Sequence, residues 1–349
     1  MVKKYLIIFV AFSIGLVGLI VIYHKVGLVD ISTQLHKLHL WQLFLVLGTS
    51  IAMMTLTICR WGLILIDLNQ KKTSWLTMIK ARLGEFAFSY LTPIAYFGGE
   101  WIRAYVMNKD KNVPVSTSLT SIFLDRISEF VAAFLFIFFG AIVMAISRSF
   151  IWGILMLIFS GIIFSGLYLA IVLVGLDKIL IFLVNFLKLN KIRYSSKNAG
   201  QTTIGERFIY LGGQVNDYFK KSRAKFVFTT FLSFLTLLVW LWQTKLIINF
   251  LGIDLSWSKI FIIKIFLATS MFMPIPANLG SYEGAHVLVF NIFGLPSDSA
   301  LALSVVNRAL DLVWITAGIF MISHSLTQIL AKILQAISNF SNRNGQSTS

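Results

Sequence analysis

Residues 91–103 read LTPIAYFGGEWIR, and residues 274–283 read PIPANLGSYE. In each stretch, proline and glycine interrupt apolar sequence, and a glutamate follows a proline after six intervening residues. The two pairs are Pro93 with Glu100, and Pro276 with Glu283. Because a charge in hydrocarbon is costly, a charged pattern that occurs twice in apolar sequence indicates a functional site and an internal repeat.

Each glutamate is followed by an Arg-x-x-acid motif. The arginine comes 26 residues after the glutamate in the first copy and 25 residues after it in the second. The motifs are Arg126 with Glu129, and Arg308 with Asp311. A difference of one residue is compatible with a duplication whose copies have diverged.

The composition is that of a polytopic membrane protein, because 57% of the 349 residues are apolar and only 13% are charged. Several apolar runs approach or exceed the roughly 20 residues that cross a bilayer, and they are too long for barrel strands. The runs are Tyr5–Tyr23, Leu40–Ile58, Phe130–Ile146, Ile151–Val174, Phe226–Phe250, Ile260–Met273 and Leu301–Ile322. We therefore expect an all-α polytopic integral membrane protein with about seven to eight helical elements.

The chain reads as one membrane domain over residues 1–330, with a first repeat at about 40–174 and a second at about 226–325. The first apolar run resembles a signal peptide, but it lacks a clear small-x-small cleavage site, so we expect a retained helix. Residues 338–349 are polar, which predicts a disordered tail.

Two broken-helix hairpins are expected inside this domain. Pro93 and the Gly98-Gly99 pair divide the segment Leu76–Met107 into two short helices, which predicts a re-entrant hairpin. Pro276 and Gly280 predict the second break. Helices restarting after such turns would point free N–H groups into a polar cavity, where an anionic headgroup can bind.

A large part of the net charge of +16 lies in one loop and not on a nucleic-acid-binding face. Residues 177–225 hold ten lysines and arginines against three acids, a net of +7. Such a loop predicts cytoplasmic placement for itself and for the amino terminus, which carries Lys3 and Lys4. Within it, Asp177–Leu189 suggests an interfacial helix and Ser195–Thr203 a flexible segment. Attraction of anionic lipid headgroups is a second role for the loop, and nucleic acid is excluded as a partner.

Six of the fourteen acidic residues lie in or beside apolar runs, each with a basic residue nearby. Four pairs have the i,i+3 spacing that places both side chains on one helix face. They are Arg82 with Glu85, Glu100 with Arg103, Arg126 with Glu129, and Arg308 with Asp311; the other two acids are Asp125 and Glu283. These charges either form a substrate site or simply hold helices together.

These motifs in combination resemble one known family. Leu91-Thr92-Pro93, Gly98-Gly99-Glu100-Trp101-Ile102-Arg103, Leu124-Asp125-Arg126, and Pro274-Ile275-Pro276 with Gly280 and Glu283 carry the resemblance. The family is the lysylphosphatidylglycerol synthase transmembrane region, a flippase-like membrane domain found alone or fused to an aminoacyl-transferase in multiple peptide resistance factor. The resemblance covers roughly Leu40 to Ile322 and implies a member without the transferase. One departure is Ile94, since the family usually has glycine after this proline.

The leading hypothesis is a flippase-like transporter, not an enzyme, that translocates or presents a lipid-linked substrate across the cytoplasmic membrane. Its substrate would be a phospholipid, an aminoacyl-lipid or a polyprenyl-glycolipid with an anionic or zwitterionic headgroup. Arginines would bind a lipid phosphate, acids would bind an amino group or balance the arginines, and glycines would let the backbone approach the headgroup. The expected substrate-binding residues are Glu100, Arg103, Asp125, Arg126, Glu129, Glu283, Arg308 and Asp311, and the expected turn residues are Pro93, Gly98, Gly99, Pro276 and Gly280.

Two other functions stay open on the sequence. The first is a membrane-embedded enzyme of a cell-envelope lipid or glycolipid pathway, with Glu100 or Asp125 as general base. The second is an accessory subunit that docks a partner through the basic loop, and a second copy of the chain is a further candidate partner. We expect no cofactor and no metal site, a packing role for His286, and a snorkelling role for Arg60 at a membrane boundary.

Overall fold

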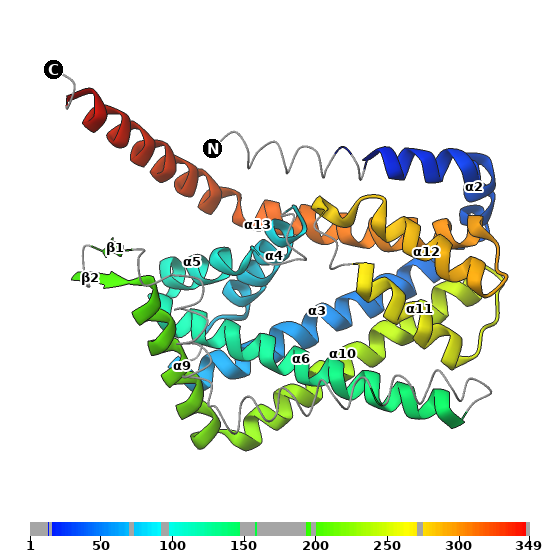
Figure 1. Cartoon of the computed structure of the whole chain (residues 1–349), viewed down its shortest axis with the longest axis horizontal. Helices are drawn as coiled ribbons and strands as arrows, with labels where there is room; N and C mark the ends of the chain where they lie inside the picture. The colour runs from blue at the N-terminus through cyan, green and yellow to red at the C-terminus, as the bar shows by residue number, and fades with distance from the viewer. Residues whose placement is uncertain are drawn as a thin grey trace.

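The computed structural model describes residues 13, 16–69, 73–91, 98–146, 158, 193–196, 200–270 and 275–346. Their regular structure is almost entirely helical, as predicted, and consists of the following elements (Figure 1). They are α2 (Leu28–His36), α3 (Leu40–Asn69), α4 (Trp75–Leu91), α5 (Glu100–Lys111), α6 (Val115–Ile146), β1 (Arg193–Ser196), β2 (Gly200–Thr203), α9 (Ile204–Lys221), α10 (Arg223–Phe250), α11 (Trp257–Ser270), the 3₁₀ turn η3 (Pro276–Asn278), α12 (Ser281–Ile292) and α13 (Ser297–Gln346).

Four helices are long and apolar enough to cross a membrane: α3, α6, α10 and the first 27 residues of α13. A fifth candidate span is the pair Leu16–Val26 and Leu28–His36, which is bent by 75°. Long apolar helices satisfy their own backbone groups, which is what a bilayer requires of a spanning segment. The chain is therefore an all-α, multi-pass membrane protein.

The same order of helices occurs twice along the chain. In the first half, a long helix, α3, precedes the short helices α4 and α5 and the long helix α6. In the second half, α10, α11, α12 and α13 follow that order. The short helices of each half pack against each other as a hairpin, and in the sequence the two proline–glycine stretches lie between the paired helices.

Local backbone conformation explains the second bend. Pro276 opens the 3₁₀ turn, and Ala277 and Asn278 have φ angles of 54° and 50° in the left-handed region. Gly280, with φ of 75°, then precedes α12. Left-handed backbone is strained for residues with a Cβ, so this turn needs stabilising contacts from elsewhere in the fold. In the first half, Pro93 lies outside the described residues, and Gly98 has φ of 136°.

The halves are held together by packing between their helices. The long helix α3 of the first half runs beside α10 of the second, α6 also packs on α10, and α13 packs on α4 (Figure 1). At the contact between α4 and α13, a Cβ on Gly318 would collide with the carbonyl oxygen of Leu83, and one on Gly84 would meet the side chain of Ile322. Small residues at such a crossing allow close approach of two membrane helices.

The helices extend beyond the apolar runs that predicted them. α3 continues to Asn69 and α6 begins at Val115, because the polar residues that bound the runs bond within the protein. α13 continues to Gln346, through most of the tail expected to be disordered, and the part of α13 just before that tail, residues 328–336, is rich in the helix-favouring residues Ala, Leu, Lys and Gln.

The basic loop holds structure that the sequence did not indicate. A hairpin of β1 and β2 occupies the segment expected to be flexible, and the helix α9 follows it. The predicted span Ile151–Val174 and the predicted interfacial helix Asp177–Leu189 lie outside the described residues, apart from Ile158.

Candidate functional site

In the first half, Glu100 links the bend to the helix α6. One carboxylate oxygen, Oε2, accepts a hydrogen bond from the backbone N–H of Gly98 at 2.7 Å. The other, Oε1, lies 3.0 Å from Nη2 of Arg126. A carboxylate at a helix start satisfies an otherwise unpaired N–H group and faces the positive end of the helix dipole. Next to it, Gly99 leaves no room for a side chain, because a Cβ would collide with the carbonyl of Glu85 and the hydroxyl of Ser89.

In the second half, Glu283 makes the corresponding pair of contacts. Its Oε2 accepts a hydrogen bond from the backbone N–H of Gly280 at 2.8 Å, and its Oε1 lies 2.9 Å from Nε of Arg308. The two copies of the sequence pattern thus place a glutamate in the same role, between a broken-helix turn and an arginine of the following long helix.

Around Glu100, four arginines and four acids form one continuous ion network, which we call the first-half network. It joins α3, α4, α5 and α6, and its pairs are 2.5–3.6 Å long. Its members are Arg60, Arg82, Glu85, Glu100, Arg103, Asp125, Arg126 and Glu129. Equal numbers of each sign make the network neutral as a whole, which lowers the cost of burying it.

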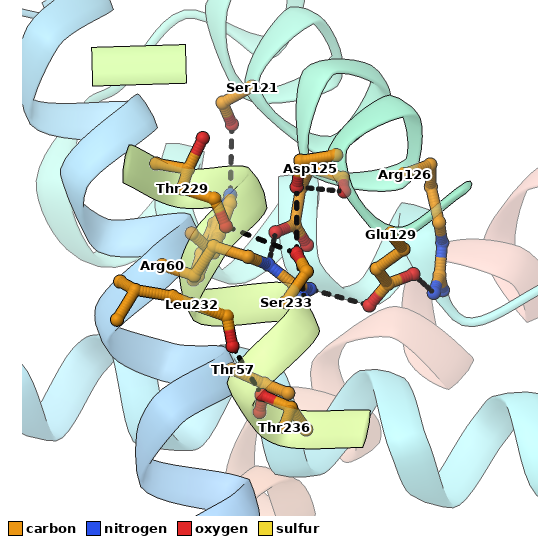
Figure 2. Close-up of polar contacts among 12 residues, drawn as sticks. Thr57, Arg60, Ser121, Asp125, Arg126, Glu129, Thr229, Leu232, Ser233 and Thr236 are labelled. Atoms are coloured by element: carbon orange, nitrogen blue, oxygen red, sulfur yellow. Dashed lines mark hydrogen bonds and ion pairs between the residues drawn. The ribbon is translucent and has the colours of Figure 1, made fainter. Parts of the chain in front are cut away.

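The centre of the network is closed to solvent. Arg60 donates to Asp125 at 2.7 Å, to Glu129 at 2.5 Å and to the hydroxyl of Ser233 on α10 at 3.0 Å (Figure 2). On the other side, Arg103 contacts Asp125 through both Nη atoms at 3.1 Å. The side chains of Asp125 and Arg103 are 0% exposed, so both hold helices in place and neither reaches a substrate in this conformation.

The other side of the network forms a partly exposed rim. The side chains of Arg82, Glu100, Arg126 and Glu129 are 13–29% exposed. Arg126 connects three of the acids, because it contacts Glu85, Glu100 and Glu129 at 2.7–3.0 Å. The rim is therefore the part of the network that a polar headgroup can approach.

Two of the four ion pairs predicted from i,i+3 spacing are present. Arg82 with Glu85 and Arg126 with Glu129 are confirmed at 2.6 and 2.7 Å. Among the described residues, the ion pairs of the other two arginines follow tertiary packing instead. Arg103 pairs with Glu85 and Asp125, and Arg308 pairs with Glu283.

Arg60 is a network residue that the sequence reading missed. The expectation of snorkelling at a membrane boundary is wrong, because Arg60 is 1% exposed and contacts two acids. The buried position of Arg60 could have been predicted from its neighbours, because apolar residues lie on both sides of it. Gly62–Ile66 continues the apolar run that begins with Leu40–Ile58. An arginine in the middle of a span needs an internal partner, whereas one at its end can snorkel.

In the second half, Arg308 holds the strained turn. Besides Glu283, its guanidinium donates to the hydroxyl of Tyr90, to the carbonyl of Ala277 at 2.6 Å and to the carbonyl of Asn278 at 3.1 Å. These carbonyls belong to the left-handed residues of the break. Tyr90 lies on α4, so this arginine also ties the second bend to the first half.

A cavity of about 270 Å³ lies between the two halves. Of the predicted site residues that the structure describes, Asp311 alone lines it. Its walls come from α3, α4, α10, α12 and α13, through Ser50, Met53, Phe86, Trp240, Gln243, Tyr282, Asn307, Leu310 and Asp311. Throughout the described part of the chain, no ion pair joins the first-half network to Glu283 and Arg308; Glu85 and Tyr90 connect them through α4. The predicted binding residues therefore fall into three groups: the first-half network, the Glu283–Arg308 pair at the second turn, and Asp311 in the cavity.

Two further predictions concern residues outside the first-half network. His286 is fully buried, with Nδ1 2.8 Å from the carbonyl oxygen of Tyr282, which suits a packing role. Among the described histidines, cysteines and acids, no group of three or more is arranged to hold a metal ion.

Comparison with protein families matches residues 6–318 to the lysylphosphatidylglycerol synthase TM region. Comparisons with curated proteins and with solved structures give no match. The family match covers most of the chain, including the ion network, both bends and the cavity. The chain belongs to the lysylphosphatidylglycerol synthase TM region family, the membrane domain of lipid-related, flippase-like proteins.

Proposed function

We propose that this protein is a flippase-like transporter, which moves a lipid-linked substrate from one leaflet of the cytoplasmic membrane to the other. The observation that carries the proposal is the pair of broken-helix turns, each held by a glutamate and an arginine of a long helix. Broken helices between inverted or repeated halves are typical of transporter centres, where irregular backbone lines a polar path.

The rim of the first-half network supplies the polar surface that such a path requires. A headgroup phosphate can replace a carboxylate on Arg126, since a guanidinium binds both with the same donor geometry. The displaced Glu100 keeps its hydrogen bond to the bend through its other oxygen. An exchange of partners at the rim costs less than stripping a headgroup of all polar contacts.

The buried centre of the network keeps the site in shape during this exchange. Arg60 and Arg103 contact Asp125 from opposite sides, and neither is open to solvent. Movement between leaflets then requires the halves to shift at the contacts of α3 with α10 and of α4 with α13. The glycines Gly84 and Gly318 let α4 and α13 approach closely at the second of these contacts.

The charge distribution supports an orientation for the chain. Lysines 3 and 4 and the basic loop 177–225 face the cytoplasm in this proposal, because positive residues concentrate on that side of a bilayer. Membrane lipids are the proposed partners, and the loop adds attraction for their anionic headgroups.

The enzyme alternative receives less support from the geometry. A general base must reach the substrate proton within hydrogen-bond distance. Asp125 is fully buried between two guanidinium groups, and both oxygens of Glu100 are engaged. The arrangement supports binding and positioning better than proton transfer.

The proposal is tested with purified protein in vesicles that carry one fluorescently labelled lipid at a time. An impermeant quencher bleaches the outer leaflet, and the remaining fluorescence reports how fast inner-leaflet lipid becomes accessible. The panel is phosphatidylglycerol, an aminoacyl-phosphatidylglycerol and a glycosylated polyprenyl phosphate. Faster exposure of at least one lipid than in protein-free vesicles supports transport, and equal rates for the whole panel contradict it.

A further inference from the structure

The cavity between the halves holds polar groups that the ion network does not use. The amide nitrogen of Asn307 is buried and has no hydrogen-bond partner in the described part of the chain, and the residue is 9% exposed. Gln243, opposite on α10, donates through its amide nitrogen to the carbonyl of Val46 and the hydroxyl of Thr49, which leaves its carbonyl oxygen as an acceptor. A buried donor without a partner is costly, so a ligand that accepts from Asn307 removes that cost.

Charge in and around the cavity is balanced. Asp311 lines it, and the buried amine of Lys264 on α11 lies 3.6 Å from the ring centroid of Trp240, another lining residue. Glu283 is paired with Arg308, and the first-half network is neutral as a whole. A phosphate placed in the cavity would face the carboxylate of Asp311, and an ammonium group would leave the amide donor of Asn307 without an acceptor. A neutral ligand with hydroxyl groups avoids both costs.

The walls favour a ring-shaped ligand with hydroxyl groups. Phe86, Trp240 and Tyr282 supply aromatic surface from three helices. The amide of Asn307, the carbonyl oxygen of Gln243 and the carboxylate of Asp311 supply donors and acceptors within the same cavity. Aromatic walls with a few placed polar groups are typical of pockets for small polar molecules. The volume of 270 Å³ is about nine times the share of one water in the liquid, enough for a single sugar ring.

We propose that this cavity binds a neutral, hydroxyl-rich head group, such as one hexosyl ring of a lipid-linked sugar. The inference rests on the proposed function, since transport of a lipid requires a site for its head group. It assigns the rim of the network to the charged part of a lipid and the cavity to an uncharged sugar. Free sugar offers the same chemistry as a lipid-linked one, and the experiment separates the two.

The test is lipid retention measured by native mass spectrometry. Protein is assembled into nanodiscs that contain monoglucosyl diacylglycerol, phosphatidylglycerol and phosphatidylethanolamine in equal amounts, with identical acyl chains. The protein released from the nanodiscs is expected to keep the glucosyl lipid about tenfold more often than either of the others, as one or two net hydrogen bonds provide. Equal retention of the three lipids, or preference for a charged one, overturns the proposal.

Two variants localise the binding. Asn307→Leu removes the buried donor, and Met53→Trp fills the cavity without removing a polar group. Both are expected to lose the preference for the glucosyl lipid, whereas Asn249→Leu, a matched change at an exposed position, keeps it. A preference that survives in both cavity variants overturns the proposal. An elution profile on gel filtration like that of the wild type shows that the variants are folded.

Competition and transport assays distinguish the remaining outcomes. If millimolar glucose displaces the glucosyl lipid, the hexosyl site stands and free sugar is a ligand; if it does not, the lipid-linked form is the ligand. A wild-type protein that translocates lipid but shows no preference for the glucosyl lipid contradicts the cavity inference alone. An intact preference with no translocation of any lipid contradicts the proposed function alone.

Discussion

Arg308 lies 2.9 Å from Glu283, and this pair connects the longest helix of the second half to its broken-helix turn. Arg126 and Glu100, 3.0 Å apart, form the same connection in the first half. In both cases the second oxygen of the glutamate accepts a backbone N–H at the bend. Each half therefore stabilises its broken helix with one carboxylate and one guanidinium.

Replacing Arg308 with glutamine should destabilise the protein strongly. The change leaves Glu283 buried without its counter-charge and leaves the carbonyls of Ala277 and Asn278 without their donor. We expect a loss of about 3 kcal/mol in the free energy of unfolding, as for other broken buried pairs. Denaturant unfolding in detergent micelles measures it, and Arg223→Gln, at an exposed arginine, is the control. Equal stability of the two variants would show that the Glu283–Arg308 pair contributes nothing to the free energy of unfolding.

Asp125→Asn tests the buried centre of the first-half network. The substitution leaves Arg60 and Arg103 with too little negative charge in a closed environment, so we expect a loss of about 3–5 kcal/mol. Thermal unfolding followed by circular dichroism reports the change. Asp254→Asn removes the same charge from an exposed pair and should cost less than about 1 kcal/mol. A small effect at position 125 would mean that the network is not a stabilising element.

Gly99→Ala and Gly213→Ala should change stability in opposite directions. A Cβ at position 99 collides with the carbonyl of Glu85, so the hairpin of α4 and α5 must open or shift. At position 213, in the exposed part of α9, a Cβ meets nothing within 4 Å, and alanine favours helix by up to about 1 kcal/mol. The measurement is the unfolding midpoint, which should be lower than that of the wild type for Gly99→Ala and higher for Gly213→Ala. A Gly99→Ala protein as stable as wild type would contradict the close approach.

A double-mutant cycle separates the rim from the centre of the network. Arg126 and Glu129 are both partly exposed, at 21% and 29%, so solvent screens their interaction. We expect a coupling energy of about 1 kcal/mol or less for Arg126→Gln with Glu129→Gln. For Arg60→Gln with Asp125→Asn, both fully buried, the coupling should be several-fold larger. Similar coupling energies for the two pairs would argue against a distinction between centre and rim.

The sequence predicts the helical class, the two bends and most of the charged residues, because these depend on local properties. Long apolar runs, prolines and glycines set where helices begin and break. The repeated Pro-x6-Glu pattern also locates both turn glutamates, since each carboxylate reaches a backbone N–H on the same turn. Its partner arginine, some 25 residues away, was identified by the repeat and not by spacing on a helix.

The pairing within the network and the location of the cavity depend on tertiary packing, which spacing does not encode. Arg103 lies at i,i+3 from Glu100, yet it turns inward to Asp125 and stacks on Trp61 at 4.4 Å. Ser233 joins the network from α10, more than 100 residues after Asp125 in the sequence. Asn307 precedes Arg308 directly, but only the packing of α13 between α4 and α12 places it in a cavity.

In the proposed mechanism the rim of the first-half network conducts lipid headgroups, so a change at Arg126 should slow translocation. Vesicles containing wild type, Arg126→Gln or Arg223→Gln are loaded with the lipid that wild type translocates, and its appearance in the outer leaflet is timed by impermeant quenching. We predict a rate at least about tenfold lower for Arg126→Gln, which corresponds to a barrier about 1.4 kcal/mol higher, with Arg223→Gln unchanged. Equal rates for folded Arg126→Gln and wild type would contradict the account.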